Sequence, residues 1–169
     1  VTFLGGSRMP PEVLAAMHDA AQNFVNIPEL QRKLGEKIAA MTHNEAAYIA
    51  TGAAAGIVLA IAACMTHDNP TARAMLPQTD GLRNEVLLFK SHNIGYAFAV
   101  RQTGAKMVLL GDGEQVTAAE LEGAINEKTA AFIWFQGTFC GRGDLPLPEV
   151  IEICQARGVP VLIDAAAQL

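Results

Sequence analysis

Residues 85–163 contain four short apolar runs, EVLLF (85–89), KMVLL (106–110), AFIWF (131–135) and VPVLI (159–163). Each run has the length of a strand and is apolar almost throughout, as expected when both faces of a sheet are covered. The segments between them have the apolar spacing of helices, at Gly95–Thr103, Thr117–Asn126 and Pro148–Arg157. Strands that alternate with helices form right-handed βαβ units. The pattern therefore predicts an α/β fold with a mostly parallel sheet sandwiched by helices.

The helix ends in this region carry signals of their own. Thr117 with Glu120 three residues later forms a capping-box pattern at the start of the second helix. Gly158 follows the third helix, where glycine commonly ends helices. These ends agree with the helix positions that the apolar spacing predicts.

Upstream of the alternating region, Gly52–Met65 consists almost wholly of small or apolar residues. A membrane span needs about 20 residues, so this segment predicts a helix buried in a folded domain. Tyr48–Ala50 is predicted to be a short strand before it. Residues 67–84 are rich in Asp, Asn, Pro, Thr and Gly, and they predict an irregular loop.

The first part of the chain has a helical pattern. A short extended piece at 2–4 precedes a helix that opens at Pro10-Pro11 and continues to about Phe24. A second helix, capped by Asn26, continues to about Met41. We therefore expect an N-terminal helical segment at 1–45 and a larger α/β domain, or part of one, at 46–169.

Composition narrows the class of protein. The 169 residues are 51% hydrophobic and 17% charged, with a net charge of −5, which favours a folded domain and argues against a nucleic-acid surface. The three cysteines are widely spaced and the four histidines lack zinc-ligand spacing, so we expect a reduced, cytoplasmic protein. The first residues lack a signal-peptide pattern and an initiator Met, and we expect the chain to be a piece of a longer protein.

Ligands of open α/β sheets bind beyond the carboxyl ends of the strands, and three places meet that description. Thr51–Gly56 joins a predicted strand to the buried helix, and small residues at a helix start let an anion reach unpaired N–H groups. The alternative is a helix start chosen only for tight packing. His92, in Ser91-His92-Asn93, directly follows a strand and could stack on a ring or act as acid or base, or it could be an ordinary loop histidine.

Asp164 is the third place, at the end of the last apolar run. A carboxylate there is partly desolvated and favours a cationic partner, such as a protonated ring nitrogen. Ala165-Ala166-Ala167 leaves space for a flat ring. The alternative is an Asp that caps the next element. Together, a phosphate site, a stacking group and an anion for a ring nitrogen match the chemistry of pyridoxal 5′-phosphate (PLP).

These motifs resemble a known family. Thr51-Gly52-Ala53-Ala54-Ala55, Ser91-His92-Asn93 with Arg101–Lys106, and Val161–Ala166 are similar, in this order, to the selenocysteine-synthase-like group of fold type I PLP enzymes. That group has the aspartate-aminotransferase fold and includes L-seryl-tRNA selenium transferases and D-glucosaminate-6-phosphate ammonia-lyases. The resemblance covers nearly the whole chain, from Gly5-Gly6-Ser7 onward. It identifies residues 46–169 as part of a PLP-binding large domain.

The resemblance also implies roles for the site residues. The amides of Gly52, Ala53 and Ala54 would hold the PLP phosphate, with Thr51 beside them. His92 would stack on the pyridine ring, and Asp164 would pair with its nitrogen, which makes the ring an electron sink. The remaining contacts would come from Ala166 beside the ring and from Gln136 or Thr138 at the ring hydroxyl.

One feature departs from the family. Fold type I enzymes attach PLP to a lysine a few tens of residues beyond the strand Asp. In this chain every lysine precedes Asp164, and the last two are Lys106 and Lys128. This lysine and the small C-terminal domain are absent from the chain, so we expect the chain as given to be inactive.

Gly5–Pro10 with Glu12-Val13 and the acidic balance favour the lyase side of the family. The expected function is a PLP-dependent lyase that removes an α-proton and a β-substituent from an amino acid or amino sugar acid. Arg8 could approach a substrate phosphate or carboxylate, or could be a solvated surface residue. The alternatives are a selenium transferase, which would act on seryl-tRNA, and a non-catalytic relative. The resemblance also implies a homodimer or higher homo-oligomer, with no membrane partner.

Overall fold

The computed structural model describes residues 6–137 and 143–166, so the expected extended piece at 2–4 lies outside the described residues. The chain divides into two compact units, Val1–Ile49 and Ala50–Leu169. The first unit contains α1 (Pro11–Ala20) and α2 (Ile27–Thr42). The Asn26 side chain accepts a hydrogen bond from the Glu29 amide and begins α2, as the sequence predicts.

The predicted strand at Tyr48–Ala50 is wrong. In the first unit the Gln31 side chain takes the backbone partners that a neighbouring strand would supply. Its Nε2 donates to the Ile49 carbonyl at 2.7 Å, and its Oε1 accepts from the Ile49 amide at 3.3 Å. Because an amide side chain offers both a donor and an acceptor, it satisfies this extended segment without a sheet.

The second unit contains a four-stranded sheet in which every pairing is parallel. Its strands are β1 (Glu85–Phe89), β2 (Lys106–Leu110), β3 (Thr129–Phe135) and β4 (Val161–Asp164). The order across the sheet is β2-β1-β3-β4. All residues of β3 are buried, because this strand lies inside the sheet and is covered on both faces. The prediction of an α/β fold with a mostly parallel sheet is confirmed.

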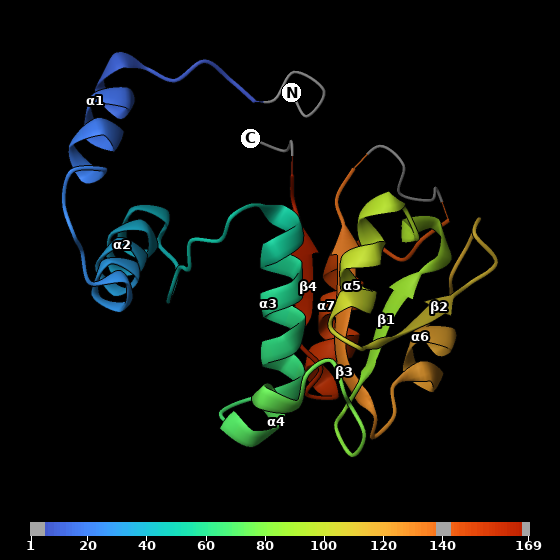
Figure 1. Cartoon of the computed structure of the whole chain (residues 1–169). Coiled ribbons are helices and arrows are strands. Elements are labelled where there is room, and N and C mark those ends of the chain that lie inside the picture. Colours follow the sequence, from blue (N-terminus) through green and yellow to red (C-terminus); the bar gives the residue numbers. More distant parts are fainter. Residues whose placement is uncertain (1–5, 138–142, 167–169) are drawn as a thin grey trace. The chain divides into compact units, whose positions relative to one another are not determined.

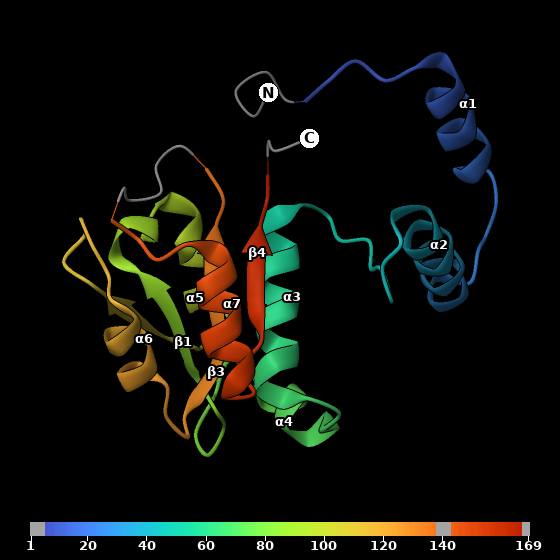
Figure 2. The ribbon, with the colours of Figure 1, turned by 180° about the vertical axis from the view of Figure 1, so that it is seen from behind.

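Helices cover both faces of this sheet. They are α3 (Ala53–Thr66), α4 (Pro70–Met75), α5 (Phe98–Gln102), α6 (Ala118–Ala124) and α7 (Leu147–Ala156). The core is formed on one face by α3 and α5 and on the other by α6 and α7 (Figure 1). Figure 2 shows the second face, with α7 in front of the strands. Successive residues of β1 alternate between the two cores, Val86 and Leu88 in the first, Leu87 and Phe89 in the second.

The loop predicted at 67–84 is only partly irregular, because it contains α4. Asn69 accepts a hydrogen bond from the Ala72 amide, and Pro70 occupies the first turn. Asn followed by Pro is a helix-start signal that the polar composition of the segment obscured. The helix predicted at Gly95–Thr103 is divided into the short turn η3 (Gly95–Ala97) and α5. The predicted helix at Gly52–Met65 is confirmed as α3.

Candidate functional site

The start of α3 and the end of β4 meet at one cavity of about 350 Å³. Ala53 and Gly56 line it from α3, and Asp164 and Ala165 line it from the end of β4. The rest of the lining is apolar and comes from α3, β3 and β4. The volume lies in the ~300–1,000 Å³ range of small-molecule sites. Two of the three sequence-predicted places therefore share one space.

The backbone at the start of α3 leaves donors available. Gly52 precedes the helix with φ +144° and ψ 172°, a conformation that is essentially restricted to glycine. The first hydrogen bond of the helix runs from the Gly56 amide to the Gly52 carbonyl at 3.0 Å. No side chain among the described residues caps this end. The amides of Ala53 and Ala54 precede that bond and have no acceptor within the helix, so they can receive an anion.

Asp164 is fixed by its own backbone surroundings. Its Oδ1 accepts a hydrogen bond from the Ala166 amide at 3.0 Å. Its carbonyl accepts from the Gln136 amide at 2.8 Å, which ties the end of β4 to the end of β3. No side chain or amide of the described residues donates to Oδ2, so this oxygen can accept from a cationic donor beside the small side chain of Ala165. An anion at the end of a parallel strand is where ligands of such sheets bind.

His92, in the turn η2 (Lys90–His92), lies in different surroundings. Its side chain is 0% exposed, and it is absent from the lining of the cavity that contains Asp164. Its Nδ1 accepts a hydrogen bond from the Phe135 amide at 3.2 Å, and its ring meets Trp134 edge to face with centroids 4.6 Å apart. Burial lowers the pKa of His92, and Asp144 partly opposes this shift. Stacking of His92 on a cofactor ring stays a prediction.

The remaining predicted contacts are spread over the same edge of the sheet. The Gln136 side chain is exposed and accepts a hydrogen bond from Trp134 Nε1 at 2.8 Å. Thr51 is exposed beside the start of α3. Ala166 contributes its amide to Asp164. Thr138 lies outside the described residues.

Sequence reasoning missed Asp144. Its side chain is 4% exposed, its Oδ2 accepts a hydrogen bond from Ser91 Oγ at 2.6 Å, and the same oxygen lies 3.3 Å from His92 Nε2. Ser91 and Asp144 are separated by more than fifty positions in the sequence, and no spacing pattern links them. A buried Asp beside a buried His is costly and tends to mark function.

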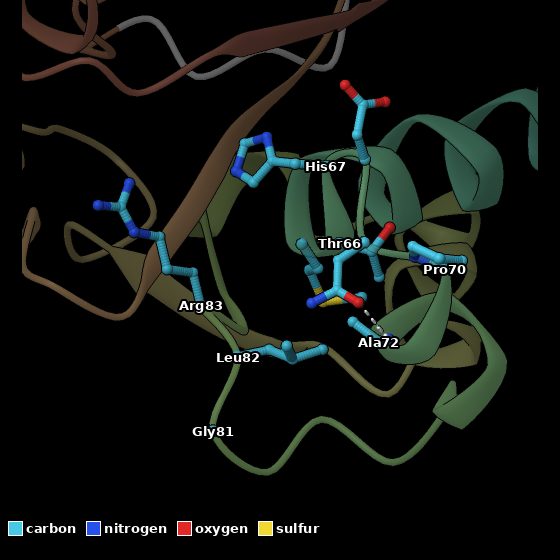
Figure 3. A pocket seen from close by; sticks show the side chains of 10 residues that line it. Thr66, His67, Pro70, Ala72, Gly81, Leu82 and Arg83 are labelled. Atoms are coloured by element: carbon cyan, nitrogen blue, oxygen red, sulfur yellow. Dashed lines mark hydrogen bonds between the residues drawn. The ribbon is translucent and has the colours of Figure 1, made fainter.

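A larger cavity, of about 740 Å³, lies at the opposite edge of the sheet, between the end of α3, the start of α4 and the segment 81–83 (Figure 3). Its polar side chains are exposed or already paired: Thr66 donates to the Ala62 carbonyl, and Asn69 caps α4. His67 and Arg83 are exposed beside it. It lies away from the carboxyl ends of the strands, and we assign it no function.

Residues 6–137 and 143–166 contain no group of three His, Cys, Asp or Glu side chains that could hold a metal ion. Within the same ranges, no helix has both the length and the hydrophobicity that crossing a membrane requires.

The sequence matches the family model of the DegT/DnrJ/EryC1/StrS aminotransferase family over residues 12–169. The chain therefore belongs to this family. The DegT/DnrJ/EryC1/StrS family and its ammonia lyase relatives are PLP-dependent, so the cofactor expected from the sequence is confirmed. The predicted resemblance to ammonia-lyases and selenium transferases is confirmed as well.

Three curated relatives match nearly the whole chain. A D-glucosaminate-6-phosphate ammonia lyase of Salmonella typhimurium is 38% identical over 99% of this chain and 47% of its own length. A 5′-C-glycyluridine monooxygenase-decarboxylase of a Streptomyces species is 33% identical over 99% of this chain and 44% of its own length. An L-seryl-tRNA(Sec) selenium transferase of Nitratidesulfovibrio vulgaris is 28% identical over 96% of this chain and 35% of its own length.

A solved structure of D-glucosaminate-6-phosphate ammonia-lyase superposes on this chain with a TM-score of 0.94 at 38% identity. The match covers 99% of this chain and 47% of that one. The chain thus spans about half the length, or less, of the relatives that it matches.

Proposed function

We propose that this chain contributes the phosphate-binding and ring-binding part of a PLP-dependent lyase. The lyase would act on an amino acid or amino sugar acid by α-proton abstraction and β-elimination. The 38% identity to an ammonia lyase over 99% of the chain supports this reaction class. PLP supplies the electron sink for such a reaction, and the protein supplies binding, orientation and electrostatics.

The single observation that carries the proposal is the shared cavity of Ala53 and Asp164. The amides at the start of α3 would hold the phosphate, with Thr51 beside Gly52. Asp164 would keep the ring nitrogen protonated, because a carboxylate in hydrogen-bond reach favours the cationic form. PLP has an anionic phosphate and a basic ring nitrogen. The start of α3 can bind an anion and Asp164 is an anion, so the cavity offers one partner for each group.

The other predicted contacts are part of the same proposal. Ala166 and Gln136 would lie beside the ring, at the ends of β4 and β3. His92 would contact the ring from the end of β1. Since the imidazole is covered in this structure, that contact requires the groups over it to shift when the cofactor binds.

The organisation of the whole protein is also proposed. Residues 1–45 would be an N-terminal helical segment, and 46–169 part of the PLP-binding large domain. The protein would be a cytoplasmic homodimer or higher homo-oligomer, with a small-molecule substrate and no nucleic-acid partner.

A PLP titration of the purified chain tests the cofactor site. Trp134 is the sole tryptophan and lies at the carboxyl end of β3, so PLP bound nearby should quench its emission. Asp164→Asn keeps an oxygen for the Ala166 amide but removes the charge. Loss of a charge-assisted hydrogen bond, about 1.5–3 kcal/mol, weakens PLP binding roughly tenfold or more.

The matched control is Asp80→Asn, the same change at an exposed loop residue. It should leave PLP affinity unchanged. Equal weakening in both variants, or no saturable quenching in the unmodified chain, would contradict the proposal.

The two alternatives predict different results. A selenium transferase would require the chain to retard seryl-tRNA in a gel, which the net charge of −5 does not favour. A non-catalytic relative would show no dependence of PLP binding on the charge of Asp164.

A further inference from the structure

Ser91 and His92 follow β1 and form a polar cluster with Asp144, which precedes α7. Both His92 and Asp144 are almost fully buried, with side-chain exposures of 0% and 4%. A parallel bridge between Gln115 and Gly143 holds the backbone beside Asp144, through hydrogen bonds from the Val116 amide to the Gly143 carbonyl and from the Gly143 amide to the Glu114 carbonyl. Burial of a carboxylate costs free energy unless its partners are well placed. We therefore ask what these buried side chains do for His92.

The hydrogen bonds determine where the imidazole carries its proton. Nδ1 accepts from the Phe135 amide, so Nδ1 carries no hydrogen. In a neutral imidazole the hydrogen then lies on Nε2, 3.3 Å from Asp144 Oδ2. This contact is an electrostatic one, because its geometry falls short of a hydrogen bond. The same oxygen accepts from Ser91 Oγ at 2.6 Å, which fixes the carboxylate beside the ring.

Protonation of His92 would add a hydrogen to Nδ1, where it would oppose the Phe135 N–H. Around the ring, β1 contributes Phe89 and β3 contributes Trp134, both uncharged. In the described part of the chain, Asp144 is the charged group that acts on His92. The geometry therefore favours a neutral ring with one defined orientation.

We propose that Asp144 is a positioning residue, which with Ser91 orients the His92 imidazole with its hydrogen on Nε2. Burial and the Phe135 N–H at Nδ1, not Asp144, keep that ring neutral. Its value to catalysis rests on the proposed function above. A neutral imidazole of fixed orientation can lie against a protonated pyridine ring, whereas an imidazolium would place a second cation there. Asp144 itself does not touch the cofactor, and it acts through His92.

The first test is the tautomer of His92 in the full chain without PLP. Long-range ¹H–¹⁵N correlation spectra distinguish Nε2–H from Nδ1–H, and His92→Gln assigns the signal. The expected result is the Nε2–H form. The Nδ1–H form, or a mixture of both, would overturn the proposal without any variant of Asp144.

The second test is a pH titration of Trp134 emission, because an imidazolium at this contact quenches an indole more than a neutral ring does. Asp144→Asn removes the anion that favours protonation, so the midpoint should move to lower pH. Ser91→Ala keeps the anion and should not lower the midpoint. Asp68→Asn, at an exposed residue, is the matched control and should leave it unchanged. A midpoint in Asp144→Asn that is unchanged or higher overturns the proposal.

PLP addition separates this inference from the proposed function. If the tautomer and the titration behave as expected but PLP shifts no His92 signal, the cofactor role of His92 fails and the Asp144 assignment stands. If PLP binds and depends on Asp164 while Asp144→Asn leaves the tautomer and the midpoint unchanged, the inference fails alone.

Discussion

Gly52→Ala should destabilise the second unit through backbone strain alone. Gly52 has φ +144° and ψ 172°, and a Cβ at this position would meet no atom within 4 Å. No steric clash therefore adds to the cost of the conformation, which for a non-glycine residue is about 1–3 kcal/mol. With a urea m value of about 2 kcal/mol/M, the unfolding midpoint should fall by roughly 0.5–1.5 M.

Gly56→Ala is the matched variant, four residues further along α3. A Cβ at Gly56 also meets no atom within 4 Å, and this glycine lies in a regular helix. Alanine there should raise the free energy of unfolding by about 1 kcal/mol, because glycine is the poorer helix former. The same substitution thus has opposite effects at two neighbouring positions.

Urea titrations followed by Trp134 emission and by circular dichroism measure both variants. The m values should match that of the unmodified chain, so that midpoints report stability. A stable Gly52→Ala chain would show that the start of α3 relaxes without cost. The conclusion that Gly52 has a backbone conformation open only to glycine would then be refuted.

Other variants test the packing and the pH dependence. Thr117→Ala removes the capping box that Thr117 and Glu120 form, which should cost about 1 kcal/mol in urea titrations; Glu120→Gln should cost less. Leu121→Ala, in the core between α6 and the sheet, should cost about 2–5 kcal/mol, and a smaller loss would show that the core collapses around the gap. Burial depresses the pKa of His92 in the folded state, so the unfolded state binds more protons below the ordinary value of 6.5. The free energy of unfolding should therefore fall as the pH drops through and below 6.5. In the His92→Gln chain this fall should be smaller. An equal slope of the free energy of unfolding against pH in both chains would contradict the assignment of the pH dependence to His92.

The strands were predictable because their apolar runs report burial directly. β1 and β2 begin and end where the sequence predicts, since a run that is covered on both faces has no polar position to blur its ends. The capping box of Thr117 and Glu120 was also predictable, because its two residues are only three positions apart. α4 was missed because polar composition outweighed the Asn69-Pro70 signal.

The candidate site was only partly predictable. Asp164 could be identified because it ends a strand, and all parallel strands end at one edge. The start of α3 could be identified from its small residues, although the strand predicted before it does not form. The surroundings of His92 could not be predicted, because they depend on Asp144 and Phe135, which only the fold brings close to it. Pairings between such distant positions carry no periodicity.

β4 is the last strand of the sheet at one side, in the order β2-β1-β3-β4. Among the described residues no further strand pairs with its outer side, and Ile163 of this strand is 45% exposed. A free edge with apolar side chains is a template for another strand. In the chain as given, Ile163→Lys should lower any self-association through this edge, because a charged residue on an edge strand disfavours pairing.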